Sequence, residues 1–321
     1  MDRRIREGAA ALCLALLAAA PARGWHGKGH HVATELAVRA AAGKLPDFFA
    51  KGAATVAHGS LDPDLFTRPI APAALHSAEA PEHYFDVELL EGNQPPPTRQ
   101  EFLALCARKP LAPDKVGLLP YAVTEWTQRL TVALAEHRAN PDNAHVQAKC
   151  LLYAGLLSHY AQDLCQPLHT TIHWDGRARK DGSSPRTRIH AKVDALLGKL
   201  EPDRQALLRQ IKPAPVLLLM PAVLAEIRRS NELVDTVYRL ETSLPELEAP
   251  LKPGSPAARF AAERLAAAAA FTASLYLTAW RDSAKIELPW WYARPFPTDK
   301  KPPARPAKAA SSTAPRPTAV K

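Results

Sequence analysis

The chain has 321 residues, of which 47% are hydrophobic and 23% are charged, and this is enough for one large domain with its own core. The net charge of +9 lies mostly at the two ends: residues 1–24 contribute +2 and residues 294–321 contribute +6, which leaves about +1 for residues 25–293. A nearly neutral body argues against the broad basic surface that binding to duplex DNA requires.

The amino-terminal segment has the pattern of a secretory signal peptide. Arg3, Arg4 and Arg6 precede an apolar run over residues 9–21, and small residues stand just before Trp25. The run is shorter than the roughly 18 residues that a membrane-spanning helix needs. We therefore expect cleavage before Trp25, with a neighbouring bond as the alternative, and a mature protein that is secreted or periplasmic.

Residues 25–293 are predicted to form one all-α domain. Apolar residues recur at helical spacing, and no stretch alternates as a strand would. The predicted helices span residues 31–42, 99–108, 119–138, 143–165, 185–200, 216–244 and 255–283. The connections 59–72 and 175–185 are rich in Pro and Gly and are expected to line one face. From residue 294 the composition predicts a disordered basic tail that acts as a solvated tether.

The mature chain keeps three cysteines, Cys106, Cys150 and Cys165, once Cys13 leaves with the signal segment. An odd number excludes complete internal pairing. Cys106 could pair with either of the others in an oxidising compartment. Because apolar residues surround all three, we expect buried free thiols.

Two pairs of His and Asp stand four residues apart, so each pair shares one face of a helix. They are His159 with Asp163 and His190 with Asp194, and His169 follows a helix break after the first pair. Such spacing also occurs in ordinary surface contacts, and a lone helical histidine is usually a core residue. Asp163, however, falls in the most apolar predicted helix, where burial of a carboxylate is costly unless a cation compensates it. The pattern therefore predicts a binuclear metal site.

Five motifs follow one another between residues 25 and 194. They are WHGKGH (25–30), GSLDPD (59–64), HYFD (83–86), HYAQDLCQPLH (159–169) and HAKVD (190–194). Their order resembles the zinc-dependent single-strand-specific nucleases of fungi and plants, within the superfamily that also holds the bacterial zinc phospholipases C. Any one motif is a weak match, but chance rarely supplies five in order. The resemblance implies a mostly helical domain with a metal cluster at the base of a cleft.

The resemblance implies three Zn²⁺ ions and assigns their ligands. The first ion would bind Asp64, His83, His159 and Asp163. The second would bind His169, His190 and Asp194. The third would bind the free α-amino group and carbonyl of Trp25, with His30 and Asp163. Because that amino group exists only after signal removal, zinc loading would be tied to export. Asp62 is an alternative to Asp64, but the proline directly before Asp64 matches the family better.

The resemblance also implies a reaction. Zinc-bound hydroxide would hydrolyse single-stranded DNA and RNA to 5′-phosphate products, and 3′-nucleotides are a further expected substrate. Asp64 would orient the attacking water. Arg68 is the candidate for stabilising charge on the phosphoryl group, although its offset from the family's basic residue leaves this assignment open. Tyr84 would stack on an unpaired base and Asp86 would hydrogen-bond its edge. The alternative is that Tyr84 only packs under its loop.

Two other functions stay open. GSLDPD also resembles the phospholipase segment, so a phospholipid is the alternative substrate. The short spacing from Trp25 to His30, and Asp194 in place of a Glu, favour the nuclease. A non-catalytic periplasmic zinc-binding protein is the third hypothesis, and no obligate protein partner is indicated.

Other polar residues near the motifs are interpreted as facing solvent. Glu79, Glu82 and Glu88 are expected to solvate the loop around His83. The remaining histidines are assigned to the surface or to loops: His26, His31, His58, His76, His137, His145 and His173.

Overall fold

The computed structural model describes Trp25 and residues 27–293, so the expected signal segment and the expected tail lie outside the described residues. Its α-helices are α2 (Gly27–Ala41), α3 (Asp47–Lys51), α4 (Ala53–Gly59), α5 (Asp62–Phe66), α6 (Ala73–Glu79), α7 (Arg99–Arg108), α8 (Pro113–Val116), α9 (Leu119–Ala139), α10 (Ala144–Asp163), α11 (Ile189–Lys199), α12 (Arg204–Gln210), α13 (Leu219–Asn231), α14 (Val234–Leu240) and α15 (Pro256–Ser283). The 3-10 helices are η2 (Ala80–His83), η3 (Val87–Leu90), η4 (Pro167–His169), η5 (Glu241–Ser243) and η6 (Trp290–Ala293). No strand forms in this part of the chain, which confirms the all-α prediction.

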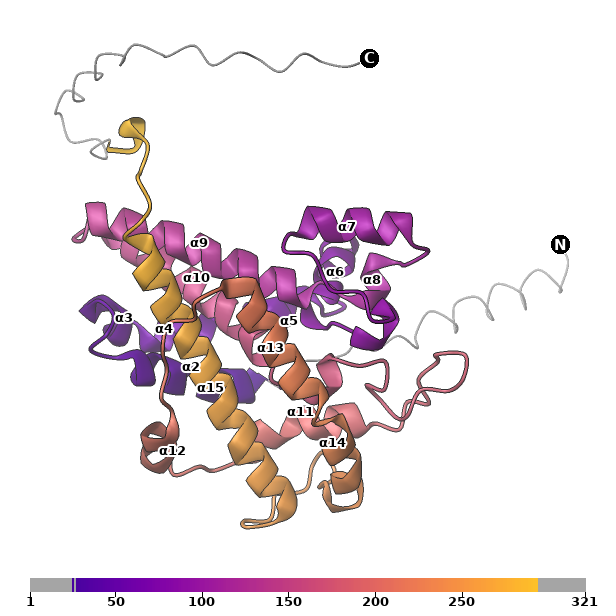
Figure 1. Ribbon diagram of the computed structural model, residues 1–321. Helices are drawn as coiled ribbons and strands as arrows, with labels where there is room; N and C mark the ends of the chain where they lie inside the picture. Colours follow the sequence, from indigo (N-terminus) through magenta and orange to yellow (C-terminus); the bar gives the residue numbers. More distant parts are fainter. Residues whose placement is uncertain (1–24, 26, 294–321) are drawn as a thin grey trace, which may run out of the picture.

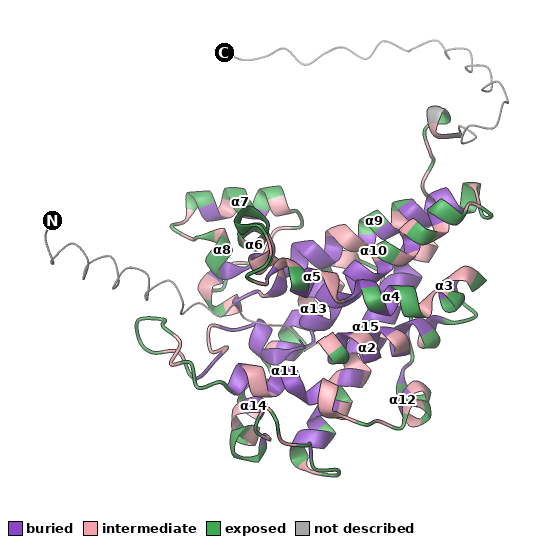
Figure 2. Ribbon diagram, turned by 180° about the vertical axis from the view of Figure 1, so that it is seen from behind, coloured by how far each residue is buried: buried purple, intermediate pink, exposed green. Residues whose placement is uncertain are grey.

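Helix α10 lies at the centre of the bundle. It packs against α9, α15, α4 and α2 (Figure 1). Every residue from position 154 to position 163 is buried, so this stretch is surrounded on all sides. Figure 2 shows the same concentration of buried residues where the central helices meet. The most apolar predicted helix is therefore the core helix, and it carries His159 and Asp163 into the interior.

Side-chain caps fix several helix starts where the sequence predicts them. Thr98 and Glu101 form a capping box at the start of α7. The Asn143 side chain accepts a hydrogen bond from the backbone N–H of His145 at 3.0 Å, and Ser255 caps α15 in the same way. These oxygens satisfy N–H groups that have no partner in the first turn. The predicted helices 99–108, 143–165 and 255–283 accordingly agree with α7, α10 and α15 to within about two residues.

The prediction of one helix over residues 216–244 is wrong, because α13 ends at Asn231 and α14 begins at Val234. The Ser230 hydroxyl donates to the carbonyl of Leu164, and the Asn231 amide donates to the carbonyl of Thr170 at 3.0 Å. These tertiary hydrogen bonds tie the end of α13 to the chain after α10. Apolar periodicity within 216–244 does not encode them.

The start of the first helix and several short helices also differ from the prediction, since α2 begins at Gly27 rather than at residue 31. The connection 59–72 contains α5, and α11 begins at Ile189 rather than at residue 185, after Arg188 in the left-handed region with φ 69°. Five further short helices were not predicted: α3, α4, α6, α8 and α12. Helices of four to seven residues contain too little periodicity to be recognised.

A close crossing of α4 and α10 positions the chain that leads into the site. A Cβ atom added to Gly155 would lie 2.8 Å from the carbonyl oxygen of Val56 and 2.9 Å from the carbonyl carbon of Gly59. Glycine at 155 therefore permits the two backbones to touch. The contact places the carbonyl of Ser60, just after α4, 2.9 Å from Nδ1 of His159.

The cysteine expectation is confirmed: Cys106, Cys150 and Cys165 are buried and free. Burial raises the pKa of all three thiols, which keeps them protonated and unreactive. None of the described helices combines the length and the apolar character needed to cross a bilayer.

Candidate metal centre

The fold brings together all eight histidines and aspartates that the sequence analysis selected. They come from α2, α5, α10 and α11 and from the 3-10 helices η2 and η4, and none is more than 5% exposed. Their potential ligand atoms form three groups in which all atoms lie within 4.8 Å of one another. The groups are His30 with His159 and Asp163, Asp64 with His83 and His159, and His169 with His190 and Asp194.

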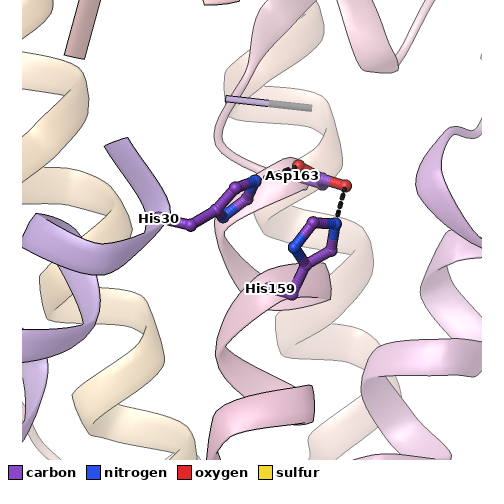
Figure 3. Close-up of side chains that lie close together, drawn as sticks. All are labelled: His30, His159 and Asp163. Carbon is purple, nitrogen blue, oxygen red and sulfur yellow. Dashed lines mark ion pairs between the residues drawn. The ribbon is translucent and has the colours of Figure 1, made fainter. Parts of the chain in front are cut away.

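Asp163 belongs to the first group and also lies close to His83 of the second. Its Oδ2 lies 3.1 Å from Nδ1 of His83 and 3.4 Å from Nε2 of His159, and its Oδ1 lies 3.4 Å from Nε2 of His30. Figure 3 shows how the geometry arises: His159 and Asp163 project one turn apart from α10, and His30 points toward them from α2. The Nδ1 of His169 also lies 3.8 Å from Oδ2. One fully buried carboxylate therefore faces four imidazoles.

The third group sits beside the other two. Nε2 of His190 lies 3.1 Å from Oδ2 of Asp194 and 3.1 Å from Nε2 of His169. Gln166 donates to the other carboxylate oxygen of Asp194 at 2.7 Å. The break after α10 turns the chain so that His169 faces both Asp163 and His190, as expected from the sequence.

Contacts with two backbone carbonyls and one side-chain amide fix the orientation of three of the imidazoles. Nδ1 of His159 faces the carbonyl of Ser60, and Nδ1 of His169 lies 2.6 Å from the carbonyl of His83. Nδ1 of His30 lies 2.7 Å from Oε1 of Gln162. A carbonyl at one ring nitrogen requires an N–H there, which leaves the other nitrogen as a lone-pair donor toward the cluster.

Several buried atoms in the cluster lack a hydrogen-bond partner among the described residues. They include Nε2 of His30, Oδ1 of Asp64 and Oδ1 of Asp163. Buried polar groups are rarely left in this state, because each one costs free energy. Imidazoles and carboxylates gathered in this way are the ligand types that a borderline divalent cation prefers. The groups can therefore hold a metal ion.

The charges of the cluster differ strongly between residues. Burial acts to raise the pKa of Asp163, but the charges of His159 and His169 and the hydrogen bonds of His159 and His83 outweigh it and hold the pKa well below its usual range. Burial raises the pKa of Asp194 well above its usual range and lowers the pKa of His30 to about 3. A cation at the centre would restore the charged form of Asp194.

The amino-terminal side of the site is anchored by Trp25. Its ring is fully buried, and its indole N–H donates to the carbonyl of Gln162 at 3.1 Å. Gln162 also holds His30 through its side chain. The start of the expected mature chain is therefore fixed next to His30 and Asp163.

Comparisons with protein families, with curated proteins and with solved structures find no match to this chain. What is established about the site is therefore its own geometry.

The three predicted residues outside the ligand set occupy different surroundings. Nη2 of Arg68 lies 3.6 Å from Oδ2 of Asp64, and the side chain is 28% exposed. The Tyr84 hydroxyl donates to the backbone carbonyl of Asp114 in α8, so the ring is tied to a neighbouring helix, and its stacking on a base stays a prediction. Asp86 is buried, and burial together with Glu88 raises its pKa well above the usual range.

The three glutamates around His83 do not simply face solvent. Glu79 lies 3.5 Å from Nε2 of His83 and accepts a hydrogen bond from the Tyr160 hydroxyl. Glu82 pairs with Arg99, and Glu88 accepts from the Thr171 hydroxyl. The solvating role expected for Glu79 and Glu82 is wrong, whereas Glu88 is exposed as expected. For Glu79 the sequence signal was its i, i+4 spacing to His83. His137 is likewise buried, against Phe48, rather than at the surface.

Proposed function

We propose that this protein is a secreted or periplasmic zinc-dependent phosphodiesterase that cleaves single-stranded DNA and RNA to 5′-phosphate products. The observation that carries the proposal is the fully buried carboxylate of Asp163 among four imidazoles, in a cluster where the lone pairs of buried His30 and Asp64 atoms have no hydrogen-bond partner among the described residues. The ordered motifs described above support the substrate class. Action on 3′-nucleotides belongs to the same proposal.

The three groups of ligands match the three expected ions in number. The residues that would hold zinc are His30, Asp64, His83, His159, Asp163, His169, His190, Asp194 and the α-amino group and carbonyl of Trp25. When bound, the zinc ions would lower the pKa of water and neutralise phosphate charge. Asp163 would be available to two of them, because its Oδ1 faces His30 of one group and its Oδ2 faces His83 of another.

The chain's own residues supply orientation and proton transfer. One oxygen of Asp64 is buried without a hydrogen-bond partner among the described residues, so it can accept the proton of the attacking water. Water oxygen then bonds to phosphorus as the bond from phosphorus to the 3′ oxygen breaks, and the 3′ oxygen takes up a proton from solvent and leaves as a hydroxyl group. Arg68, partly exposed beside Asp64, would offer N–H donors to the phosphoryl oxygens as negative charge grows.

The decisive experiment combines metal analysis with assays on protein whose amino terminus has been sequenced. Purified mature protein is expected to contain zinc, to cleave single-stranded DNA and RNA, and to lose activity in a strong chelator. The variant Asp163→Asn is expected to lose both zinc and activity. Zinc without hydrolysis of any phosphodiester would instead identify a non-catalytic zinc-binding protein. A metal-free and chelator-resistant enzyme would overturn the proposal.

Phospholipase C activity is the second candidate, and one observation favours it. Leu65 and Ile70 are 51% and 84% exposed, on the same short segment that carries Asp64 and Arg68. Apolar side chains beside a phosphodiesterase site are suited to an acyl chain or a lipid surface. Release of diacylglycerol from phosphatidylcholine, with single-stranded DNA left intact, would decide for this candidate.

A further inference from the structure

The connection between η4 and α11 contains a concentrated set of cations. Residues 173–188, called here the basic loop, hold Arg177, Arg179, Lys180, Arg186 and Arg188. Only two acids, at positions 175 and 181, oppose them, so the loop has a net charge of +3. Since residues 25–293 sum to about +1, the rest of the body is near −2. The loop is therefore a local excess of positive charge in a body whose remainder has a slightly negative net charge.

The base of the loop is fastened to the metal centre. The backbone carbonyl of Asp175 accepts from the N–H of Thr187 at 3.1 Å and from the Ser184 hydroxyl at 2.8 Å. The buried carboxylate of Asp175 accepts from the backbone N–H of His190 at 3.4 Å. The two ends of the loop thus close on each other directly beside a predicted zinc ligand.

An aromatic ring links the cations to the same ligand. The ring of Trp174 packs edge-on to the ring of His190, with centroids 5.7 Å apart. The guanidinium of Arg186 lies over the Trp174 ring, 5.6 Å from its centroid. The guanidinium of Arg186 is therefore separated from His190, a member of the third ligand group, only by the ring of Trp174.

The backbone of the loop is constrained where its arginines stand. Arg186 and Arg188 have φ of 56° and 69°, a left-handed conformation that costs about 1 kcal/mol or more for a residue with a side chain. The tip is closed by a hydrogen bond from the N–H of Arg179 to the carbonyl of Ser183 at 2.9 Å. Residues held in sparsely populated conformations gather at binding sites.

Most of these cations are available to a ligand. Arg177 pairs with Asp235 and packs on Tyr238. Among the ion pairs of residues 27–293, none neutralises Arg179, Lys180 or Arg186, and all three are exposed. The loop contains no exposed large apolar side chain, which a membrane-binding loop would use to enter a lipid surface. A chain of phosphates suits it better than a bilayer.

We infer that the basic loop is a binding site for the phosphates of a single-stranded nucleic acid on either side of the bond being cleaved, with Arg179, Lys180 and Arg186 as its contacts. This inference rests on the proposed phosphodiesterase function. It explains how a nearly neutral body holds a polyanion, and it makes the length of the substrate strand a determinant of KM.

The test compares two triple variants that remove the same charge. One changes the loop (Arg179→Gln, Lys180→Gln and Arg186→Gln), and the other changes exposed residues elsewhere (Lys51→Gln, Arg209→Gln and Lys212→Gln). The control residues lie in α3, in α12 and just after α12, and both helices are on the opposite side of the molecule from the basic loop in Figures 1 and 2. Cleavage of a single-stranded oligonucleotide is measured over a range of salt concentrations, together with hydrolysis of bis(p-nitrophenyl) phosphate.

Each lost phosphate contact lowers the slope of log affinity against log salt by about 0.7 for a single strand, so the loop variant should lose about 2 from the slope. KM for the oligonucleotide should rise by at least about tenfold at low salt, and the control variant should keep the wild-type slope. Equal slopes for the two variants, or an equal loss on the small diester and the oligonucleotide, would overturn the inference.

Failure of the proposed function is distinguishable from failure of this inference. If the wild-type protein hydrolyses neither substrate, the salt dependence of binding is measured on the same variants by fluorescence anisotropy of a labelled oligonucleotide. Loop-dependent binding there supports the inference without catalysis. Loop-dependent binding to phosphatidylglycerol vesicles, with none to the oligonucleotide, would assign the loop to a membrane surface and overturn the inference.

Discussion

Glu79 stands behind His83 on the side away from Asp163. Oε1 of Glu79 lies 3.5 Å from Nε2 of His83, while Nδ1 of the same ring lies 3.1 Å from Asp163. The Tyr160 hydroxyl donates to Oε1 of Glu79 and so holds the carboxylate in place. Burial acts to raise the pKa of Glu79, but hydrogen bonds from His83 and Tyr160 outweigh it and lower the pKa. An ionised carboxylate in this position orients a metal-binding imidazole and raises its basicity.

Glu79→Gln should therefore weaken zinc binding by about 10- to 100-fold, because the neutral amide no longer supports the imidazole. Competition with a chromogenic chelator measures the affinity. Glu35→Gln is the matched control, since Glu35 makes the same i, i+4 contact, at 3.6 Å, with the partly exposed His31. Thermal unfolding of both chelated variants reports folding separately. Equal zinc affinity in the two variants would show that Glu79 does not act through His83.

Zinc binding should expel a proton from His83. Burial alone would lower the pKa of this ring, but the hydrogen bonds and charges of Asp163 and Glu79 outweigh it and raise the pKa to about 10. At neutral pH the ring is therefore protonated in the metal-free protein, whereas a metal ligand must be unprotonated. Zinc affinity should rise with pH up to the pKa of the ring, by about tenfold per pH unit for this one proton.

The pKa shift of His30 has the opposite direction. Burial lowers the pKa of this ring to about 3, so the ring is already neutral and releases no proton when zinc binds. Calorimetric titration with zinc in two buffers of different ionisation enthalpy counts the protons. A heat that does not depend on the buffer would contradict the protonated state of His83 in the metal-free protein.

The sequence predicts the candidate metal ligands better than it predicts the residues that hold those ligands in place. His159 with Asp163 and His190 with Asp194 are recognisable because four residues make one helical turn, and both pairs do share a helix face. Glu79 has the same spacing to His83, but it spans the end of α6 and the 3-10 helix η2, where no apolar periodicity marks a helix. Its role depends on Tyr160, which is distant in the sequence and reaches it only in the folded protein.

The crossing of α4 and α10 is a second feature that the sequence could not predict. A glycine within an apolar helix indicates only a local loss of stability, about 1 kcal/mol relative to alanine. The structure shows instead that Gly155 touches the backbone of Gly59 and that this contact aligns Ser60 with His159. Close backbone contacts depend on which helices meet, and periodicity within one helix contains no such information.

Gly155→Ala should therefore destabilise the protein by about 1–3 kcal/mol, because the new methyl group would overlap backbone atoms that cannot rotate away. Gly198→Ala is the matched control on α11: its Cβ would lie 3.4 Å from the Lys28 side chain, and it should change stability by less than about 1 kcal/mol. Urea unfolding of the zinc-free proteins measures both. If the two variants have equal stability, the close crossing does not exist as described.

The amino terminus should control how many zinc ions are bound. Trp25 is fully buried, and its indole N–H is held by the carbonyl of Gln162, so its backbone nitrogen is confined near His30 and Asp163. A chain that begins at Trp25 has a free amine there, whereas a retained Gly24 converts the same nitrogen into an amide without a lone pair for a metal. Protein that keeps Gly24 should therefore lose one of the three expected ions and most of its activity, while one glycine added after Lys321 should change neither. Zinc per chain, determined by elemental analysis after dialysis, distinguishes the two proteins. Equal zinc content and activity in both would show that the amine is not a ligand and that the side chains of His30, His159 and Asp163 hold the ion without it.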